Sequence, residues 1–223
     1  MHGSAALFDG LRAHAPAGLT LHTVDYPSEG PQDYGSLQAW LEPRLPSGET
    51  PYAIVAESFS GPLAVRIAAA EPRGLAALVL VNSFVAAPMG PVLGAAAMFG
   101  MPLASRLGVP ARAIRARMVG ADAPDALVAR VGEILRGVPR ATLAARMTTV
   151  ARANETSAYL RTWLPIFYLR SDADRLVPER ALAEMIRIRP GLQVHRTPGP
   201  HLLLQRHPER AAEVLQLCLS DRG

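Results

Sequence analysis

The sequence predicts an α/β fold in which a mostly parallel sheet is covered by helices on both faces. Two short, continuously apolar segments, residues 52–56 and 75–81, are typical of strands buried on both sides. Helical patterns separate the expected strands, so strands and helices alternate along the chain, as a parallel sheet requires. Ligands of such sheets bind at the carboxyl ends of the strands, so residues that follow a strand are the first candidates for a site.

The remaining elements are expected from the same kinds of pattern. Residues 19–24 are rich in β-branched and apolar side chains and are followed by the turn signal Asp25-Tyr26-Pro27, which predicts a strand. Apolar residues at helical spacing predict a helix over residues 37–45. The other predictions are a helix over 61–70, a strand over 166–169, a helix over 179–187, a strand over 192–195 and a closing helix over 208–219.

A different pattern occupies the middle of the chain. Residues 88–158 are rich in alanine and arginine, with helical periodicity broken by prolines and glycines. We therefore expect a cap of three or four short helices over residues 88–158, inserted into a core formed by residues 1–87 and 159–223. Several apolar cap residues either line an acyl pocket or pack the cap onto the core, and both interpretations stay open: Met89, Val92, Leu93, Met98, Phe99, Met101 and Leu103.

Composition excludes several classes of protein. The 223 residues are enough for one sizeable domain, and 49% of them are hydrophobic. The net charge is +4, but the arginines are scattered and few aromatics accompany them, so no nucleic-acid partner is expected. The single cysteine, Cys218, allows no internal disulfide and forms no metal-binding spacing, and its place in a helical pattern predicts a packed side chain.

No membrane segment or leader is expected. The N-terminus lacks a basic region followed by an apolar run, so it does not resemble a secretory signal. Residues 74–105 contain no charge, but prolines and glycines interrupt this stretch, which favours a buried strand followed by an apolar surface segment over a membrane span. We expect a cytoplasmic protein, and the oligomeric state stays open.

The strongest chemical signal is Ala56-Glu57-Ser58-Phe59-Ser60-Gly61, between a predicted buried strand and a predicted helix. A serine exposed on a sharp strand-to-helix turn is the usual nucleophile of the pattern G-x-S-x-G, and here the small residues Ala56 and Ser60 stand at the two glycine positions. Ser58 is the predicted nucleophile, with the Phe59 amide directed at a developing oxyanion. Ser60 is the alternative nucleophile. Glu57 either tunes the site or points to solvent, and solvent is the preferred interpretation.

A serine nucleophile needs a base, and the base needs an acid. Of six histidines, His201 is preferred because it follows a strand on a loop before the last helix. The segment 171–178 follows another strand and offers two carboxylates. Asp174 is preferred because apolar Val177-Pro178 can anchor the loop, and Asp172 is the alternative. The other histidines are His2, His14, His22, His195 and His207.

These residues resemble the α/β-hydrolase superfamily, in particular bacterial esterase-like members with an E-S-F-S-G elbow. The resemblance covers nearly the whole chain and rests on residues 57–61, 171–178 and 199–201, with nucleophile, acid and base in the expected order. It implies a helical cap and acyl transfer without a metal ion or organic cofactor. It also implies strands before residue 1, which this sequence lacks, and a second oxyanion donor at the position of Met1.

The sequence therefore predicts a serine hydrolase that cleaves a carboxylic ester or thioester through an acyl-enzyme on Ser58. The apolar cap favours a small-molecule substrate with an apolar acyl or aryl group. Two alternatives stay open. A C–C hydrolase or lyase would use the same triad, and a non-catalytic binding protein would have the same fold.

Overall fold

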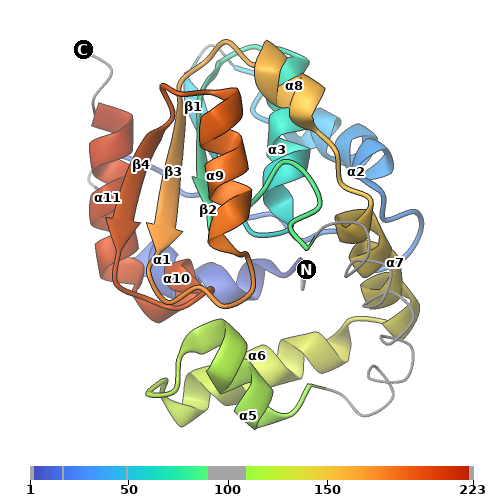
Figure 1. The fold of residues 1–223 in the computed structure, drawn as a ribbon, viewed down its shortest axis with the longest axis vertical. Helices are drawn as coiled ribbons and strands as arrows, with labels where there is room; N and C mark the ends of the chain where they lie inside the picture. Colours follow the sequence, from blue (N-terminus) through green and yellow to red (C-terminus); the bar gives the residue numbers. More distant parts are fainter. Residues whose placement is uncertain (1–2, 17, 49, 90–108, 221–223) are drawn as a thin grey trace.

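A four-stranded sheet forms the centre of the molecule (Figure 1). The computed structural model describes residues 3–16, 18–48, 50–89 and 109–220. All strand pairs are parallel, and the strands follow the chain order β1-β2-β3-β4 across the sheet. The predicted mostly parallel sheet is confirmed. The strands are β1 (Tyr52–Glu57), β2 (Leu75–Val81), β3 (Ile166–Ser171) and β4 (Gln193–Thr197).

Helices cover both faces of this sheet, as predicted (Figure 1). One face carries α3 (Ser60–Ala69), α8 (Thr156–Arg161) and α9 (Glu179–Ile188), and the other carries α1 (Asp9–Ala13) and α11 (Pro208–Ser220). The other helical elements of the core are η1 (Ala5–Phe8), α2 (Tyr34–Leu41), η2 (Glu42–Arg44) and α10 (Leu203–Arg206).

The side chains of β2 explain why this strand is apolar throughout. Leu78 and Leu80 pack into the cluster under α3, α8 and α9, whereas Val79 and Val81 pack into the cluster under α11. Successive side chains of a strand point to opposite faces, so both faces must be apolar when both are covered. Full burial of each side chain contributes about 1.5–3 kcal/mol. Cys218 of α11 packs into the second cluster, so its predicted role as a packed side chain is confirmed.

The predicted strand over residues 19–24 is wrong. This segment has no regular secondary structure and forms no strand with any described residue, and Leu19 and Val24 are exposed. It is held instead by the first helical elements: Arg12 donates to Thr23 Oγ1, and the neighbouring Asp25 accepts from the amide of residue 5. β-branched composition alone does not make a strand, because the ladder needs a neighbouring strand to complete its hydrogen bonds.

Among the described residues, three helices lie between β2 and α8 in the sequence; α5 and α6 lie beyond the carboxyl ends of the strands, and α7 lies to one side, near α2 (Figure 1). They are α5 (Ala111–Ile114), which continues into a π-helical turn over Arg115–Val119, α6 (Asp125–Gly137) and α7 (Arg140–Ala151). Ile114, Val128 and Val131 form an apolar cluster with Leu202, the residue after His201. A cap therefore packs directly beside the predicted base, while its bounds at residues 88 and 158 stay a prediction.

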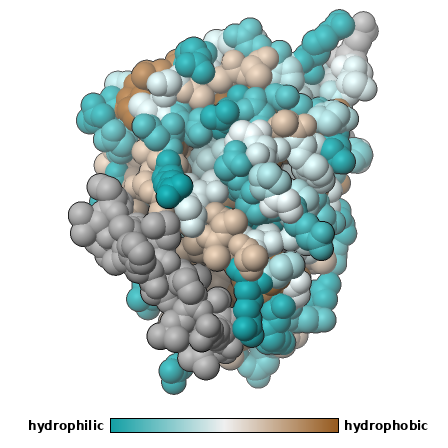
Figure 2. All heavy atoms as spheres, turned by 90° about the vertical axis from the view of Figure 1, so that its right-hand side faces the viewer, coloured by the Kyte–Doolittle hydropathy of each residue, from teal (hydrophilic) through white to brown (hydrophobic). Residues whose placement is uncertain are grey.

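Most of the residues suggested for an acyl pocket lie outside the part of the chain that the structure describes. Val92, Leu93, Met98, Phe99, Met101 and Leu103 fall outside the described residues, and Met89 is partly exposed. Figure 2 shows one face of the molecule, on which hydrophilic residues predominate and apolar residues form small groups between them. Within the described ranges, no helix combines the length and the apolar character that a membrane span requires.

Candidate active site

The chain reverses sharply between β1 and α3, and Ser58 occupies the turn. Its φ of 55° lies in the left-handed region, which is uncommon for a residue other than glycine. The Ser58 amide donates to the carbonyl of Val81 at 2.9 Å, and the Ser58 carbonyl accepts from the amide of Gly61 at 3.1 Å. This strained turn lies at the carboxyl edge of the sheet, where the predicted nucleophile is expected, and it leaves the Ser58 side chain half-buried.

Gly61 makes the turn possible. A Cβ atom at this position would lie 1.8 Å from Ser83 Oγ, so α3 can approach the segment after β2 only where a side chain is missing. Ser60, the alternative nucleophile, begins α3, and its hydroxyl accepts a hydrogen bond from Tyr26 at 2.8 Å. Tyr26 was not anticipated, because it was assigned to a turn signal rather than to the site.

The structure brings the three predicted residues Ser58, His201 and Asp174 together. His201 Nε2 lies 2.9 Å from Ser58 Oγ, and His201 Nδ1 lies 2.9 Å from Asp174 Oδ1. All three residues follow strands at the carboxyl edge of the sheet: Ser58 after β1, Asp174 after β3 and His201 after β4. The side chains of His201 and Asp174 are almost completely buried. One continuous chain of hydrogen bonds therefore joins a carboxylate, an imidazole and a hydroxyl.

Asp174 is the better placed of the two candidate acids. Its Oδ1 also accepts from the amides of Leu176 and Val177 at 2.8 and 3.1 Å. Burial acts to raise the pKa of Asp174, but the hydrogen bond and charge of His201, together with these amides, leave it lowered. Asp172 is exposed at the start of the same loop. The buried carboxylate is thus held ionised beside the imidazole.

Arg170 is a further member of the site that sequence reasoning missed. Its Nη1 donates to Asp174 Oδ2 at 3.1 Å and to the Val177 carbonyl at 3.0 Å, and its Nε pairs with Glu179 at 3.1 Å. The buried guanidinium therefore fixes the second oxygen of Asp174 and the loop that follows. A charged residue at the end of the apolar strand Ile166–Ser171 was the available signal, because such a residue is rarely buried without a partner.

The expectation that Glu57 points to solvent is wrong. Glu57 is 8% exposed, and its carboxylate accepts from Gln205 Nε2 at 2.8 Å and from the amide of Leu204 at 3.4 Å. Burial raises the pKa of Glu57, while the positive charge of His201 and the two hydrogen bonds oppose this rise. Glu57 precedes the nucleophile but ends a strand whose neighbours are covered by α10, which places its carboxylate inside the molecule.

The other histidines lie elsewhere. His14 is exposed and contacts Glu209. His22 is exposed in the segment 19–24. The His195 ring lies against Phe167. His207 stands just before α11, and burial together with Arg206 and Arg210 lowers its pKa. His2 lies outside the described residues. Of the described histidines, only His201 forms a hydrogen bond with Ser58.

The two predicted oxyanion donors differ in what can be said of them. Phe59 directly precedes α3, where helix geometry gives the amide no intrahelical acceptor. Its ring is buried between Tyr26 and Tyr34, and Tyr34 also donates to the Phe59 carbonyl at 3.1 Å. The backbone of Phe59 is therefore firmly held beside Ser58. Met1 lies outside the described residues.

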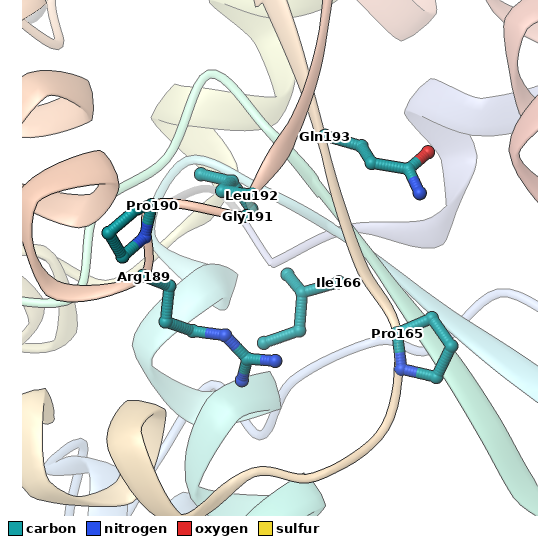
Figure 3. Close-up of a pocket in the computed structure, with 7 residues that line it drawn as sticks. All are labelled: Pro165, Ile166, Arg189, Pro190, Gly191, Leu192 and Gln193. Atoms are coloured by element: carbon teal, nitrogen blue, oxygen red, sulfur yellow. The ribbon is translucent and has the colours of Figure 1, made fainter.

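A hollow of about 350 Å³ lies at the opposite edge of the sheet (Figure 3). It is lined by residues 165, 166 and 189–193, at the beginnings of β3 and β4. Arg189, its charged residue, donates to the carbonyls of Tyr159 and Thr162. This hollow is therefore separate from the Ser58 site. Within the described part of the chain, no three His, Cys, Asp or Glu side chains are grouped as metal ligands would be.

A parallel sheet with a strained serine turn, a histidine and an acid at its carboxyl edge has the features of an α/β hydrolase. Residues 1–214 match the model of the alpha/beta hydrolase family. The chain therefore belongs to the alpha/beta hydrolase family. No curated protein sequence matches it.

Solved structures of several hydrolases have the same fold. A hydrolase from Oleispira antarctica is 11% identical with a TM-score of 0.82, over 100% of this chain and 89% of that one. A thermophilic esterase from Thermogutta terrifontis is 18% identical with a TM-score of 0.79, over 97% and 85%. An enol-lactonase from Burkholderia xenovorans is 14% identical with a TM-score of 0.75, over 98% and 88%. At these identities the likeness extends to the fold alone.

Proposed function

We propose that the chain is a serine hydrolase that cleaves carboxylic esters or thioesters through an acyl-enzyme on Ser58. The observation that carries the proposal is the pair of 2.9 Å contacts that links Ser58 Oγ to His201 and His201 to Asp174. A serine hydroxyl is a weak nucleophile, and this arrangement supplies a base in reach of its proton and an acid that fixes the base. The names of two similar structures, an esterase and an enol-lactonase, agree with an ester substrate.

In the proposed mechanism, Ser58 Oγ attacks the acyl carbonyl carbon while its proton passes to His201 Nε2. The negative charge of Asp174 stabilises the resulting imidazolium, and the carboxylate accepts the Nδ1 hydrogen bond throughout. The Phe59 amide, with Met1 as the second donor, stabilises the oxyanion of the tetrahedral intermediate. Collapse breaks the bond to the alcohol or thiol, which takes the proton from His201. Water activated by His201 then hydrolyses the acyl-enzyme and restores Ser58.

The substrate preference is part of the same proposal. The cap cluster around Leu202 brings apolar side chains beside His201, which favours an apolar acyl or aryl group over a charged one. Water-excluding surroundings also strengthen the electrostatic interactions on which the oxyanion depends. A cytoplasmic location and independence from metal ions and cofactors stay predictions.

A fluorophosphonate probe and a panel of p-nitrophenyl esters of increasing acyl length test this function, with an acyl thioester as the further substrate. We expect the probe to label the chain and esters to be hydrolysed, and Ser58→Ala to abolish both. Ser60→Ala is the matched control, because it removes a neighbouring hydroxyl, and it should retain labelling. Labelling without hydrolysis of any ester would favour C–C bond cleavage, and an unlabelled, folded chain would favour a binding protein.

A further inference from the structure

The segment directly after β2 contacts the loops of all three proposed catalytic residues, although it contributes none of them. Asn82 and Ser83 are both completely buried. Their side chains meet the nucleophile turn after β1, the end of β3 that leads into the acid loop, and the loop that carries His201. No local sequence pattern indicates a role for either residue.

Asn82 joins the base loop to the acid loop through its side-chain amide. Its Nδ2 donates to the His201 carbonyl and to Ser171 Oγ, both at 2.8 Å, and its Oδ1 accepts from the Ser171 amide at 2.8 Å. Both ends of the amide are thus used, and these partners fix which end is nitrogen, because a carbonyl needs a donor and an N–H needs an acceptor. Burial of an amide is unfavourable unless it is hydrogen-bonded, so this fully paired arrangement resists rotation.

The backbone holds Asn82 in place from the other side. Its amide donates to the carbonyl of Leu169 at 3.0 Å, and its φ of 45° lies in the left-handed region, which asparagine tolerates better than most residues. Ser83 next to it is fixed by Tyr168, whose hydroxyl accepts from the Ser83 amide at 2.9 Å and donates to its carbonyl at 2.7 Å. Hydrogen bonds to β3 therefore fix the backbone of residues 82 and 83, which directly follow β2.

Ser83 connects this fixed segment to the predicted nucleophile, Ser58. Its hydroxyl donates to the carbonyl of Ser58 at 2.6 Å. The carbonyls of the nucleophile and of the base thus both accept hydrogen bonds from adjacent residues of one segment. A displacement of either loop would break a buried hydrogen bond and leave a polar group unpaired, which costs about 1–3 kcal/mol.

We propose that Asn82 is a positioning residue, which holds the His201 backbone at the distance where the imidazole reaches both Ser58 and Asp174. The inference rests on the proposed function, because it gives Asn82 its effect through the base. Misplacement of a reacting group by about 1 Å lowers the rate by about 100-fold, so small shifts of this loop matter. The side-chain hydrogen bonds of Asn82 go to Ser171 and to the backbone of the His201 loop, and not to the hydroxyl of Ser58 or the ring of His201.

Two variants separate the His201 contact from the rest of the network. Asn82→Asp keeps the shape and the acceptor for the Ser171 amide, but it cannot donate to the His201 carbonyl. Asn82→Ala removes every side-chain contact. We expect kcat to fall by about 10- to 100-fold in both, with KM nearly unchanged. Ser171→Ala is the matched control: it removes only the Oγ partner of Asn82, and kcat should stay within about twofold of wild type, far from the loss expected for misplacement.

A double-mutant cycle distinguishes positioning from a general structural role. In a His201→Ala background the base is gone, so Asn82→Asp should cause no further loss of the residual ester hydrolysis. An equal loss in both backgrounds, or wild-type kcat in a folded Asn82→Asp chain, would overturn the inference. Asn82→Asp alone decides the matter if Asn82→Ala does not fold.

A spectroscopic measurement keeps the inference separate from the proposed function. The proton between His201 Nδ1 and Asp174 should give a strongly downfield NMR signal in the wild type and in Ser171→Ala, and this signal should be lost or shifted in Asn82→Asp. This readout needs no turnover. A chain without esterase activity would refute the proposed function, whereas an unchanged signal in Asn82→Asp would refute the role of Asn82.

Discussion

The edges of the sheet at the carboxyl and amino ends of the strands differ in the polar groups they contain and in the partners of those groups. At the carboxyl edge, buried Arg170 donates to Asp174, and buried Asn82 donates to Ser171 and to the His201 carbonyl. The backbone of Ser58 at the same edge is strained. At the amino edge lies the hollow of about 350 Å³, whose arginine, Arg189, donates to backbone carbonyls and lies over the ring of Tyr159.

The difference between the two edges lies in their polar groups, not in the presence of a hollow. A buried polar group or a strained residue is unfavourable for folding, and such features persist where the surroundings hold them in place. At the carboxyl edge they converge on one hydroxyl. At the amino edge the charged group of the hollow, Arg189, donates to backbone carbonyls of the chain itself.

Removal of the negative charge of Asp174, which completes the hydrogen-bond chain at the carboxyl edge, is expected to reduce activity most. Asp174→Asn should lower kcat by about 10,000-fold, because the amide stabilises the wrong tautomer of His201 and provides no charge for the imidazolium. Steady-state hydrolysis of the best p-nitrophenyl ester measures this loss. The fold should persist, as checked by circular dichroism.

Asp172→Asn is the matched control for this prediction, because the exposed Asp172 lies two residues earlier in the same loop. It should retain wild-type kcat. If Asp172→Asn proves as damaging as Asp174→Asn, the acid is misassigned and the carboxyl edge loses its special status.

A pair of glycine substitutions compares the packing of the two edges. Gly61→Ala would place Cβ 1.8 Å from Ser83 Oγ, whereas Gly191→Ala, at the rim of the hollow, meets no atom within 4 Å. Overpacking usually costs about 1–3 kcal/mol, and we expect Gly61→Ala to reach or exceed the upper value because a nearby segment must shift. Gly191→Ala should change the free energy of unfolding by less than about 0.5 kcal/mol. Urea denaturation of both variants measures the contrast, which disappears if the two are equally stable.

Local sequence patterns were enough to predict most of the sheet and to select three residues, Ser58, Asp174 and His201, that the structure brings within hydrogen-bond distance. Buried parallel strands need continuously apolar residues, and the residues that follow strands at one edge are brought together by the fold itself. Ser58, Asp174 and His201 could therefore be selected by their places after strands, although 143 positions separate Ser58 from His201.

The supporting residues could not be found in the same way. Asn82 and Arg170 act through side-chain contacts across strands, and no local pattern specifies which carbonyl or carboxylate will lie opposite them. The error for Glu57 has the same origin, because its burial depends on α10, far along the chain. The prediction of a strand over residues 19–24 was wrong for a related reason, because strand formation depends on a partner strand and not only on composition.

The last prediction concerns Glu57, the buried carboxylate that precedes Ser58, and its expected effects are the weakest. Burial raises the pKa of Glu57 above its ordinary value of 4.5. A raised folded-state pKa gives stability that is fully present below the unfolded value and is lost as the pH rises through the folded value. Glu57→Gln cannot ionise, so its melting temperature should exceed that of the wild type by more at about pH 8 than at about pH 4. Differential scanning calorimetry at the two pH values measures this difference.

The same substitution should lower activity. The Glu57 carboxylate interacts favourably with a positive His201, the state that forms during attack by Ser58, so its removal should lower kcat by about three- to tenfold, equivalent to roughly 1 kcal/mol. Glu213→Gln, at an exposed position of α11, is the control and should change neither stability nor kcat. A Glu57→Gln chain that is less stable than the wild type at neutral pH would show that the hydrogen bonds of the carboxylate outweigh its burial.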